Sequence, residues 1–159
     1  MRGVTAFLAC VLLAGVLPAY AGAVIVPQRG MAGVQLGMTA PEVGAVLGEP
    51  TASERVTAEG GVMLCCLYSF PGRLRVLLFE GERVSAVSTT GRTERTSDGV
   101  GVGSSLRAAK RVFRSTRCGR VGGSLSCSLV RCRPVTHRAT YVVARRGRIR
   151  EIGITTCNA

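Results

Sequence analysis

The chain has 159 residues, of which 21 are basic and nine acidic, and its formal net charge is +12. This length suits one domain with a core of its own, which buries about two thirds of the surface of the unfolded chain. Aromatic residues make up only 4% of the sequence. Because no aromatic stacking platform lies among the arginines, we expect no sequence-specific nucleic-acid binding.

The N-terminus has the three parts of a secretory signal peptide. Arg2 supplies the positive charge, residues 4–16 are apolar, and small residues at 19–23 offer a cleavage site. The apolar stretch is shorter than the roughly 20 residues that cross a bilayer. We therefore expect residues 1–23 to be removed, leaving one monomeric domain over 24–159, secreted or in the cell envelope, with no transmembrane segment. Lipidation of Cys10 is the alternative, but this cysteine precedes most of the apolar stretch instead of ending it.

The first predicted element of the mature chain is a helix that begins at Thr39. Glu42 follows three residues later, which is the spacing of a capping box. Apolar residues then recur at helical spacing, and Gly48 with Pro50 ends the helix. Three strand-like runs follow, over 62–69, 73–79 and 83–88.

The second half repeats this order of elements. Ser104 or Ser105 caps a helix whose apolar face holds Leu106, Ala109 and Phe113. Three strand-like runs follow, over 125–131, 140–144 and 148–155. The glycine-rich stretch before the helix matches neither a Walker loop nor a dinucleotide-binding loop, so we interpret it as a cap lying close to the sheet and expect no cofactor.

The two halves align with each other. Residues 36–48 correspond to 102–114, and residues 77–90 correspond to 142–156. The sequence thus predicts an α+β domain of two tandem repeats, about 30–95 and 96–159, each a helix followed by a three-stranded meander. Six antiparallel strands would form one sheet with both helices on one face.

The start of the first repeat resembles a motif of two related families. The residues that carry the resemblance are Leu36-Gly37-Met38-Thr39, Glu42-Val43, Val46-Leu47-Gly48 and Pro50, with Gly103-Ser104-Ser105 as a second copy. One family is the small lipoprotein of the outer-membrane β-barrel assembly machinery. The other is the secreted β-lactamase inhibitory protein, which carries the unit in tandem.

This resemblance implies a non-enzymatic protein that binds another protein through the open face of its sheet. The inhibitors use an aromatic-rich concave face, for which this chain offers Tyr68, Phe70, Phe79 and Tyr141. The chain departs from the inhibitors in having so few aromatic residues. It departs from the lipoprotein in having no cysteine within residues 22–30.

Six cysteines remain after residue 23, and an even number in an exported domain predicts up to three disulfides. Cys118 and Cys127 flank a glycine-rich segment and are expected to close a local loop, and Cys132 with Cys157 is the next expected pair. Cys65 and Cys66 are adjacent, so they either pair under strain or leave one buried thiol. No Cys-x-x-Cys occurs and His137 is the single histidine, so we expect no metal site.

The basic residues are concentrated in the second half of the chain. Residues 24–99 hold seven arginines and eight acidic residues, whereas residues 100–159 hold 13 basic residues and one acid, Glu151. Two basic strips are expected to attract an anionic partner, such as an acidic envelope polymer or protein. They comprise Arg107, Lys110, Arg111 and Arg114 on a helix face, and Arg145, Arg146, Arg148 and Arg150 near the final turn. The alternative is a solvated surface enriched in arginine by codon usage.

We expect no enzymatic activity, because catalytic groups do not come together in the sequence. His137 has a single carboxylate, Glu151, in its half of the chain, and the acidic residues form no pair of the glycosidase kind. Three hypotheses remain. The protein binds another protein through its sheet face, or binds a polyanion through its basic half, or exchanges thiols at Cys65 and Cys66. Salt dependence separates the first two, and replacing both cysteines by serine tests the third.

Overall fold

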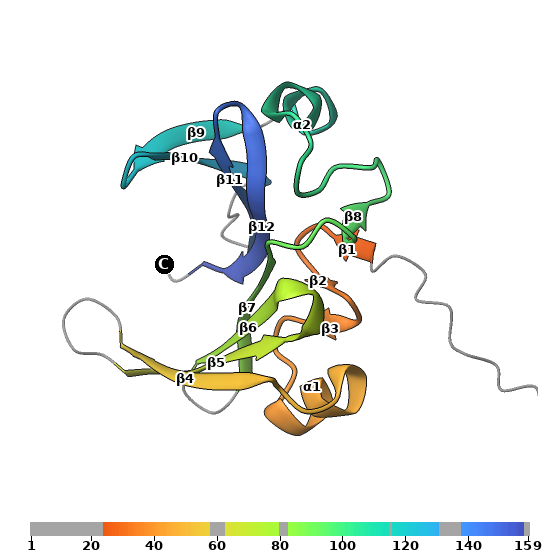
Figure 1. Ribbon diagram of the computed structural model, residues 1–159, viewed down its shortest axis with the longest axis vertical. Helices are drawn as coiled ribbons and strands as arrows, with labels where there is room; N and C mark the ends of the chain where they lie inside the picture. Colours follow the sequence, from red (N-terminus) through yellow and green to blue (C-terminus); the bar gives the residue numbers. More distant parts are fainter. Residues whose placement is uncertain (1–23, 58–62, 80–82, 115, 131–137, 158–159) are drawn as a thin grey trace, which may run out of the picture.

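The computed structural model of the chain describes residues 24–57, 63–79, 83–114, 116–130 and 138–157. Its main feature is an eight-stranded antiparallel sheet with the strand order β4-β5-β6-β7-β12-β11-β10-β9 (Figure 1). The first half of the chain supplies β4 (Ala52–Thr57), β5 (Met63–Phe70), β6 (Leu74–Phe79) and β7 (Arg83–Thr89). The second half supplies β9 (Arg117–Val121), β10 (Ser124–Val130), β11 (Arg138–Arg145) and β12 (Arg148–Thr156).

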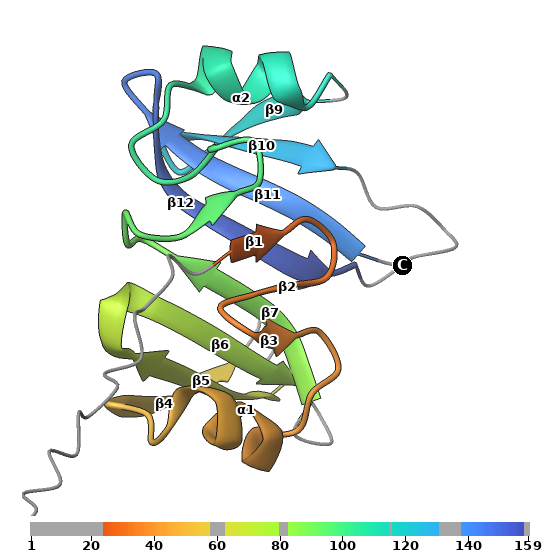
Figure 2. The same cartoon turned by 90° about the vertical axis from the view of Figure 1, so that its right-hand side faces the viewer.

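Two helices and a second, smaller sheet lie together on one side of the large sheet (Figures 1 and 2). The helices are α1 (Ala40–Leu47) and α2 (Leu106–Val112). The small sheet has the order β3-β2-β1-β8 and consists of β1 (Val24–Val26), β2 (Gly30–Met31), β3 (Val34–Gln35) and β8 (Arg95–Thr96). A single 3-10 turn, Pro71–Arg73, joins β5 to β6. The α+β class predicted from the sequence is confirmed.

Each half contains four consecutive strands of the large sheet, not the three expected. The two strands that were not predicted, β4 and β9, are the edge strands of the sheet. Almost every residue of β4 and all of β9 are exposed. An edge strand with both faces in solvent has no buried row, so its sequence lacks the alternation that marks a strand. The small sheet was also missed, since its strands have only two or three residues.

The two halves meet where their last strands, β7 and β12, pair antiparallel, with Val87 opposite Ile154. Equivalent positions on the two sides of this junction carry the same contacts. The Arg83 guanidinium donates to the Gly37 carbonyl at 3.0 Å, and that of Arg148 donates to the Gly103 carbonyl at 3.1 Å. Both glycines have left-handed backbone, with φ of 92° and 90°, which glycine adopts without steric cost.

The core lies between the large sheet and the helices, and strand alternation creates it. In β6, Leu74, Val76 and Leu78 are buried while the residues between them are half-buried on the other face. In the second half the buried apolar side chains of β12 are those of Ile149, Ile152 and Ile154. Val43 of α1 and Leu106 and Ala109 of α2 close the core from the helix side.

Both helices begin at the predicted caps. The Thr39 backbone N–H donates to the Glu42 carboxylate at 2.7 Å, and this bond lowers the pKa of Glu42. The Ser105 hydroxyl accepts from the Ala108 N–H at 3.1 Å. Helix α2 ends at Val112, so Arg114 lies beyond it and does not continue the predicted basic face.

Candidate functional site: the open face of the sheet

The face of the large sheet opposite the helices is called the open face here, because no element of the described residues covers it (Figure 1). Cross-strand register divides the open face into rows of side chains. One row joins Leu67 through Leu77 and Ala86 to Thr155 and Ala139. Four of these five residues are apolar, and this apolar row crosses from the first half of the chain into the second.

A second row runs beside the apolar row through the middle of the open face. It is formed, strand by strand, by Ser69, Arg75, Ser88, Gly153, Tyr141, Ser128 and Arg117. Ser88 and Gly153 at the junction of the two halves are small and buried. The two smallest residues of this row therefore lie where the halves meet, and the ring of the neighbouring Tyr141 covers Gly153.

Three polar side chains from the two halves meet at this centre. The Tyr141 hydroxyl donates to Glu151 Oε1 at 3.2 Å, and the Arg75 guanidinium donates to Glu151 Oε2 at 3.3 Å. The side chains of Arg75 and Glu151 are 43% and 22% exposed, so solvent screens this ion pair in part. We call these three residues the Arg75–Glu151–Tyr141 cluster. It links the two halves of the chain through polar side chains at the middle of the open face, where the half-exposed Arg75 guanidinium carries the accessible charge.

Burial and the neighbouring Glu151 carboxylate raise the pKa of Tyr141 to about 12. Both effects disfavour the phenolate. Tyr141 thus stays protonated at neutral pH and acts as a hydrogen-bond donor.

This pKa predicts a loss of stability at high pH. The unfolded chain titrates its tyrosines near pH 10, so between pH 10 and about 12 the unfolded chain releases a proton that the folded chain keeps. The free energy of unfolding should therefore be unaffected by this group below pH 10 and fall on the order of 2 kcal/mol as the pH rises to 12. Absorbance titration of tyrosinate should show a late transition that Tyr141→Phe removes. A transition near pH 10 for both Tyr68 and Tyr141 would contradict this prediction.

Gly153 makes the position of the Tyr141 ring possible. The two residues are directly opposite each other on β12 and β11. A Cβ added at Gly153 would lie 2.5 Å from Tyr141 Cζ and 2.6 Å from its hydroxyl oxygen. The ring therefore lies over the glycine, which brings the hydroxyl within reach of Glu151.

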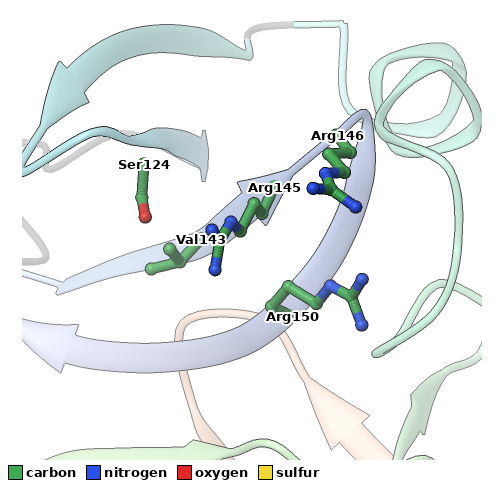
Figure 3. A pocket seen from close by; sticks show the side chains of 5 residues that line it. All are labelled: Ser124, Val143, Arg145, Arg146 and Arg150. Carbon is green, nitrogen blue, oxygen red and sulfur yellow. The ribbon is translucent and has the colours of Figure 1, made fainter.

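A basic hollow lies at the end of the open face, beside the turn between β11 and β12. Its volume is about 520 Å³, and it is lined by Ser124, Val143, Arg145, Arg146 and Arg150 (Figure 3). The register of β11 and β12 shifts between Val143 and Ala144, which makes Arg150 the additional residue of this irregularity. Such an irregularity re-aims a side chain. All three arginines are exposed, and within the described residues none of them forms an ion pair.

A second hollow lies beside the same β11–β12 turn. Its volume is about 590 Å³, and it is lined by Ser105, Leu106, Arg107, Lys110 and Gly147. Both central residues of the turn, Arg146 and Gly147, have positive φ, as in the tight turns that match the twist of a hairpin. Arg146 lines the first hollow and Gly147 the second, so the turn separates two basic hollows.

The structure divides the predicted basic residues into three groups. Arg145, Arg146 and Arg150 come together in the first hollow, and Arg107 and Lys110 in the second. Arg111 and Arg114 are exposed but line neither hollow. Arg148 donates to the Gly103 carbonyl and so belongs to the scaffold that positions α2.

The predicted aromatic residues do not share one face. Phe70 is only 5% exposed and lies in the core, and Tyr68 packs against that core. Both alternate in phase with the buried strand residues, which places them on the helix side. Phe79 and Tyr141 lie on the open face. The open-face residues that sequence reasoning missed are Arg75, Leu77 and Gly153. The phase of alternation in β6 was the signal that could have found the first two.

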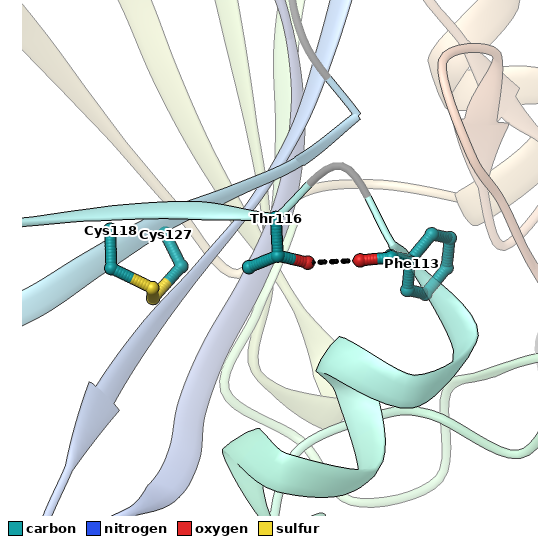
Figure 4. Close-up of a disulfide and its surroundings, with 4 residues drawn as sticks. All are labelled: Phe113, Thr116, Cys118 and Cys127. Atoms are coloured by element: carbon teal, nitrogen blue, oxygen red, sulfur yellow. Dashed lines mark hydrogen bonds between the residues drawn. A yellow bond between two sulfur atoms is a disulfide. The ribbon is translucent and has the colours of Figure 1, made fainter.

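The predicted local disulfide is present. Cys118 and Cys127 are directly opposite each other on β9 and β10 and are bonded (Figure 4). Just before this hairpin, the Thr116 hydroxyl donates to the Phe113 carbonyl at 2.5 Å. Cys157 is also disulfide-bonded, while its expected partner Cys132 lies outside the described residues. Cys66 is half-buried in β5 opposite Leu78.

Two further sequence expectations concern residues that the structure does not describe. Residues 1–23, with the predicted signal peptide, and His137 are among them. The described part of the chain contains no cluster of three potential metal ligands. Neither of its helices is long and apolar enough to cross a membrane.

Comparison with known proteins identifies the fold but no family. No family model and no curated protein matches the sequence. Three solved structures are similar. An uncharacterised protein, yfeY, from Escherichia coli has a TM-score of 0.55 at 12% identity, over 80% of this chain and 97% of its own.

The other two similar structures come from Bacillus species. The DUF4309 family protein YjgB of Bacillus subtilis has a TM-score of 0.52 at 13% identity, over 78% of this chain and 82% of its own. An extracellular protein containing an SCP domain from Bacillus anthracis has a TM-score of 0.52 at 9% identity, over 76% of this chain. The match spans 44% of the length of that protein. Such low identities show a shared fold alone, and none of the three descriptions mentions β-lactamase inhibition or barrel assembly.

Proposed function

We propose that the protein is an exported, non-enzymatic binding module that holds another folded protein on its open face. The observation that carries this proposal is the asymmetry of the large sheet. One face is covered by two helices and a small sheet, and the other presents an apolar row beside a polar centre. A surface on which half-buried apolar residues adjoin a few oriented polar groups has the composition of a protein interface.

Charge and cysteine chemistry indicate the kind of partner. The second half of the chain carries a net charge of +12, from 13 basic residues and one acid. Arg117 and Arg145 lie on the open face in this half, so a partner with an acidic surface would be steered toward it. The disulfide between Cys118 and Cys127 is typical of proteins in oxidising compartments. The partner is thus expected among acidic proteins of the envelope or the extracellular medium.

Affinity capture tests this proposal. The purified protein, with its disulfides formed, is the bait for proteins of the producing cell's envelope and culture fluid, and bound material is eluted in a salt gradient. We expect one dominant protein to be retained at high salt, because apolar contacts weaken less with ionic strength than phosphate contacts do. Capture of mixed anionic material alone, with no protein retained at high salt, would contradict the proposal.

A variant of the apolar row makes the test specific. Leu77 lies in the middle of that row, and Leu77→Gln should weaken binding of the captured protein by tenfold or more, about 1.4 kcal/mol or above. The matched control is Val46→Gln on α1, which is 44% exposed and far from the open face. Both substitutions leave the net charge unchanged. Equal binding by the two variants, with both folded by thermal denaturation, would show that the partner does not use the open face.

A further inference from the structure

We propose that the β11–β12 hairpin tip is a binding site for a soluble polymer of phosphate groups. The site consists of Arg145, Arg146 and Arg150, which line one hollow, with Arg107 and Lys110 in the hollow on the other side of the turn. This site is separate from the apolar row to which the protein partner is assigned.

Comparison of the two halves of the chain shows that the scaffold does not require Arg145 or Arg150. In the first half, the terminal strand pair is Phe79 with Arg83, and in the second it is Arg145 with Arg148. The β6–β7 register shifts at the equivalent place, where Ser85 is the additional residue, its hydroxyl donating to the Leu77 carbonyl at 3.1 Å. Arg145 and Arg150 thus stand where the first half has Phe79 and Ser85.

The scaffold does require one arginine in each half, Arg83 and Arg148. Their side chains form hydrogen bonds that the three arginines of the hollow lack. Arg83 and Arg148 each donate to the carbonyl of a left-handed glycine ahead of a helix. By contrast, the side chains of Arg145, Arg146 and Arg150 make no hydrogen bond to a described residue. The only acidic residue of this half, Glu151, is already bonded to Arg75 and Tyr141. Three guanidinium groups are therefore left to bind an anion from outside.

The donors in the hollow favour phosphate as that anion. A guanidinium carries five N–H donors in a planar fork that binds two oxygens of a phosphate group at once. Ser124 adds a hydroxyl, and Val143 gives the wall an apolar side. Each hollow exceeds 500 Å³, which is more space than one phosphate ion needs. Because Arg146 and Gly147 are adjacent, a chain of phosphates that follows the turn would pass from one hollow to the other.

The test uses sodium tripolyphosphate as the probe, titrated calorimetrically into the full chain at low ionic strength. The variant R145Q/R146N/R150Q removes the three arginines, and asparagine is chosen at position 146 because it tolerates the positive φ of 52°. We expect its affinity to fall about tenfold or more. The charge-matched control, R111Q/R114Q/R120Q, removes three exposed arginines that line neither hollow and should bind within about twofold of the original protein.

The polymer path has its own readout. R107Q/K110Q should leave tripolyphosphate binding unchanged but weaken binding of long-chain polyphosphate. It should also reduce the dependence of that binding constant on salt concentration, because fewer counterions are released. If R145Q/R146N/R150Q and R111Q/R114Q/R120Q lost the same affinity for tripolyphosphate, binding would depend on overall charge alone, and the proposed site would be wrong. Binding to vesicles of phosphatidylcholine with phosphatidylglycerol in the absence of tripolyphosphate binding would also contradict it. None of these variants changes Leu77. A negative result here therefore does not contradict the proposed function, and a negative result with Leu77→Gln does not contradict the phosphate site.

Discussion

Replacing Gly153 by alanine is expected to lower the free energy of unfolding by about 2–3 kcal/mol, because the added methyl group collides with a ring that cannot easily move. The Cβ would lie 2.5 Å from Tyr141 Cζ, well inside van der Waals contact. Gly153 is buried in the middle of the open face, in strand β12, which pairs with β7 to join the two halves. Relief requires either a shift of β12 or rotation of Tyr141 away from Glu151. Chemical denaturation with urea measures the loss.

A second glycine of the same sheet is a suitable control. Gly119 lies in β9, and a Cβ added there would meet no atom within 4 Å. Gly119→Ala should be neutral or stabilise the protein by a few tenths of a kcal/mol, since alanine has less freedom in the unfolded chain. If both variants lost the same stability, strand propensity and not the Tyr141 ring would explain the Gly153 effect.

A double-mutant cycle isolates the contact between Gly153 and Tyr141. Tyr141→Ala removes the ring, so Gly153→Ala should cost less in that background by 1 kcal/mol or more. The same rotation of the ring would separate its hydroxyl from Glu151, so the late tyrosinate transition should move toward pH 10 in Gly153→Ala. If the losses of unfolding free energy were additive and the tyrosinate transition of Gly153→Ala were unchanged, the Tyr141 ring would not lie against Gly153.

The central part of the fold could be predicted from the sequence because it is amphipathic. The capping residues Thr39 and Ser105 mark the starts of the helices, and the central strands alternate between buried and half-buried residues. The edge strands could not be predicted in this way. In β9, every residue from Arg117 to Val121 is exposed, so the segment shows no alternation of apolar and polar residues.

The candidate site was less predictable, because it depends on the phase and register of the strands. Tyr68 and Phe70 were expected on the open face by residue type, yet they share the phase of Leu74 and Val76 and face the core. Arg75 reaches Glu151 only because β7 pairs with β12 and brings the two halves together. That pairing joins residues 76 positions apart in the chain, a distance over which local sequence patterns carry no information.

The basic residues of the second half were predicted in part: their number could be read from the sequence, but their individual contacts could not. The concentration of arginine in the second half is plain from the sequence. Of the expected helical strip, Arg107, Lys110 and Arg111 lie on α2, and the first two line the second hollow. Arg148 was grouped with its neighbours by sequence, but its bond to Gly103 separates it from them. A scaffold role of this kind becomes visible only when the equivalent bond of Arg83 to Gly37 is seen in the other half.

Breaking the disulfide between Cys118 and Cys127 is expected to cost about 2–3 kcal/mol of stability. The bond closes a loop across a sequence separation of nine, and the loop-closure entropy lost by the unfolded chain predicts a loss of this size. The bonded strand β9 is a fully exposed edge strand, so few tertiary contacts hold it in place without the cross-link. Opening should therefore be local as well as global, with fast hydrogen exchange in β9.

Two variants separate the cross-link from the packing of its sulfur atoms. Cys118 is exposed, whereas Cys127 is fully buried, so C118A breaks the bond while the buried sulfur stays in place. We expect C118A to show nearly the whole loss, and C118A/C127A to add about 1 kcal/mol for the cavity at position 127. A larger denaturant dependence in C118A would indicate that the unfolded chain has become less compact. If C118A were as stable as the original protein and the loss appeared only with C127A, packing of the buried sulfur, and not restriction of the unfolded chain, would be what this disulfide contributes.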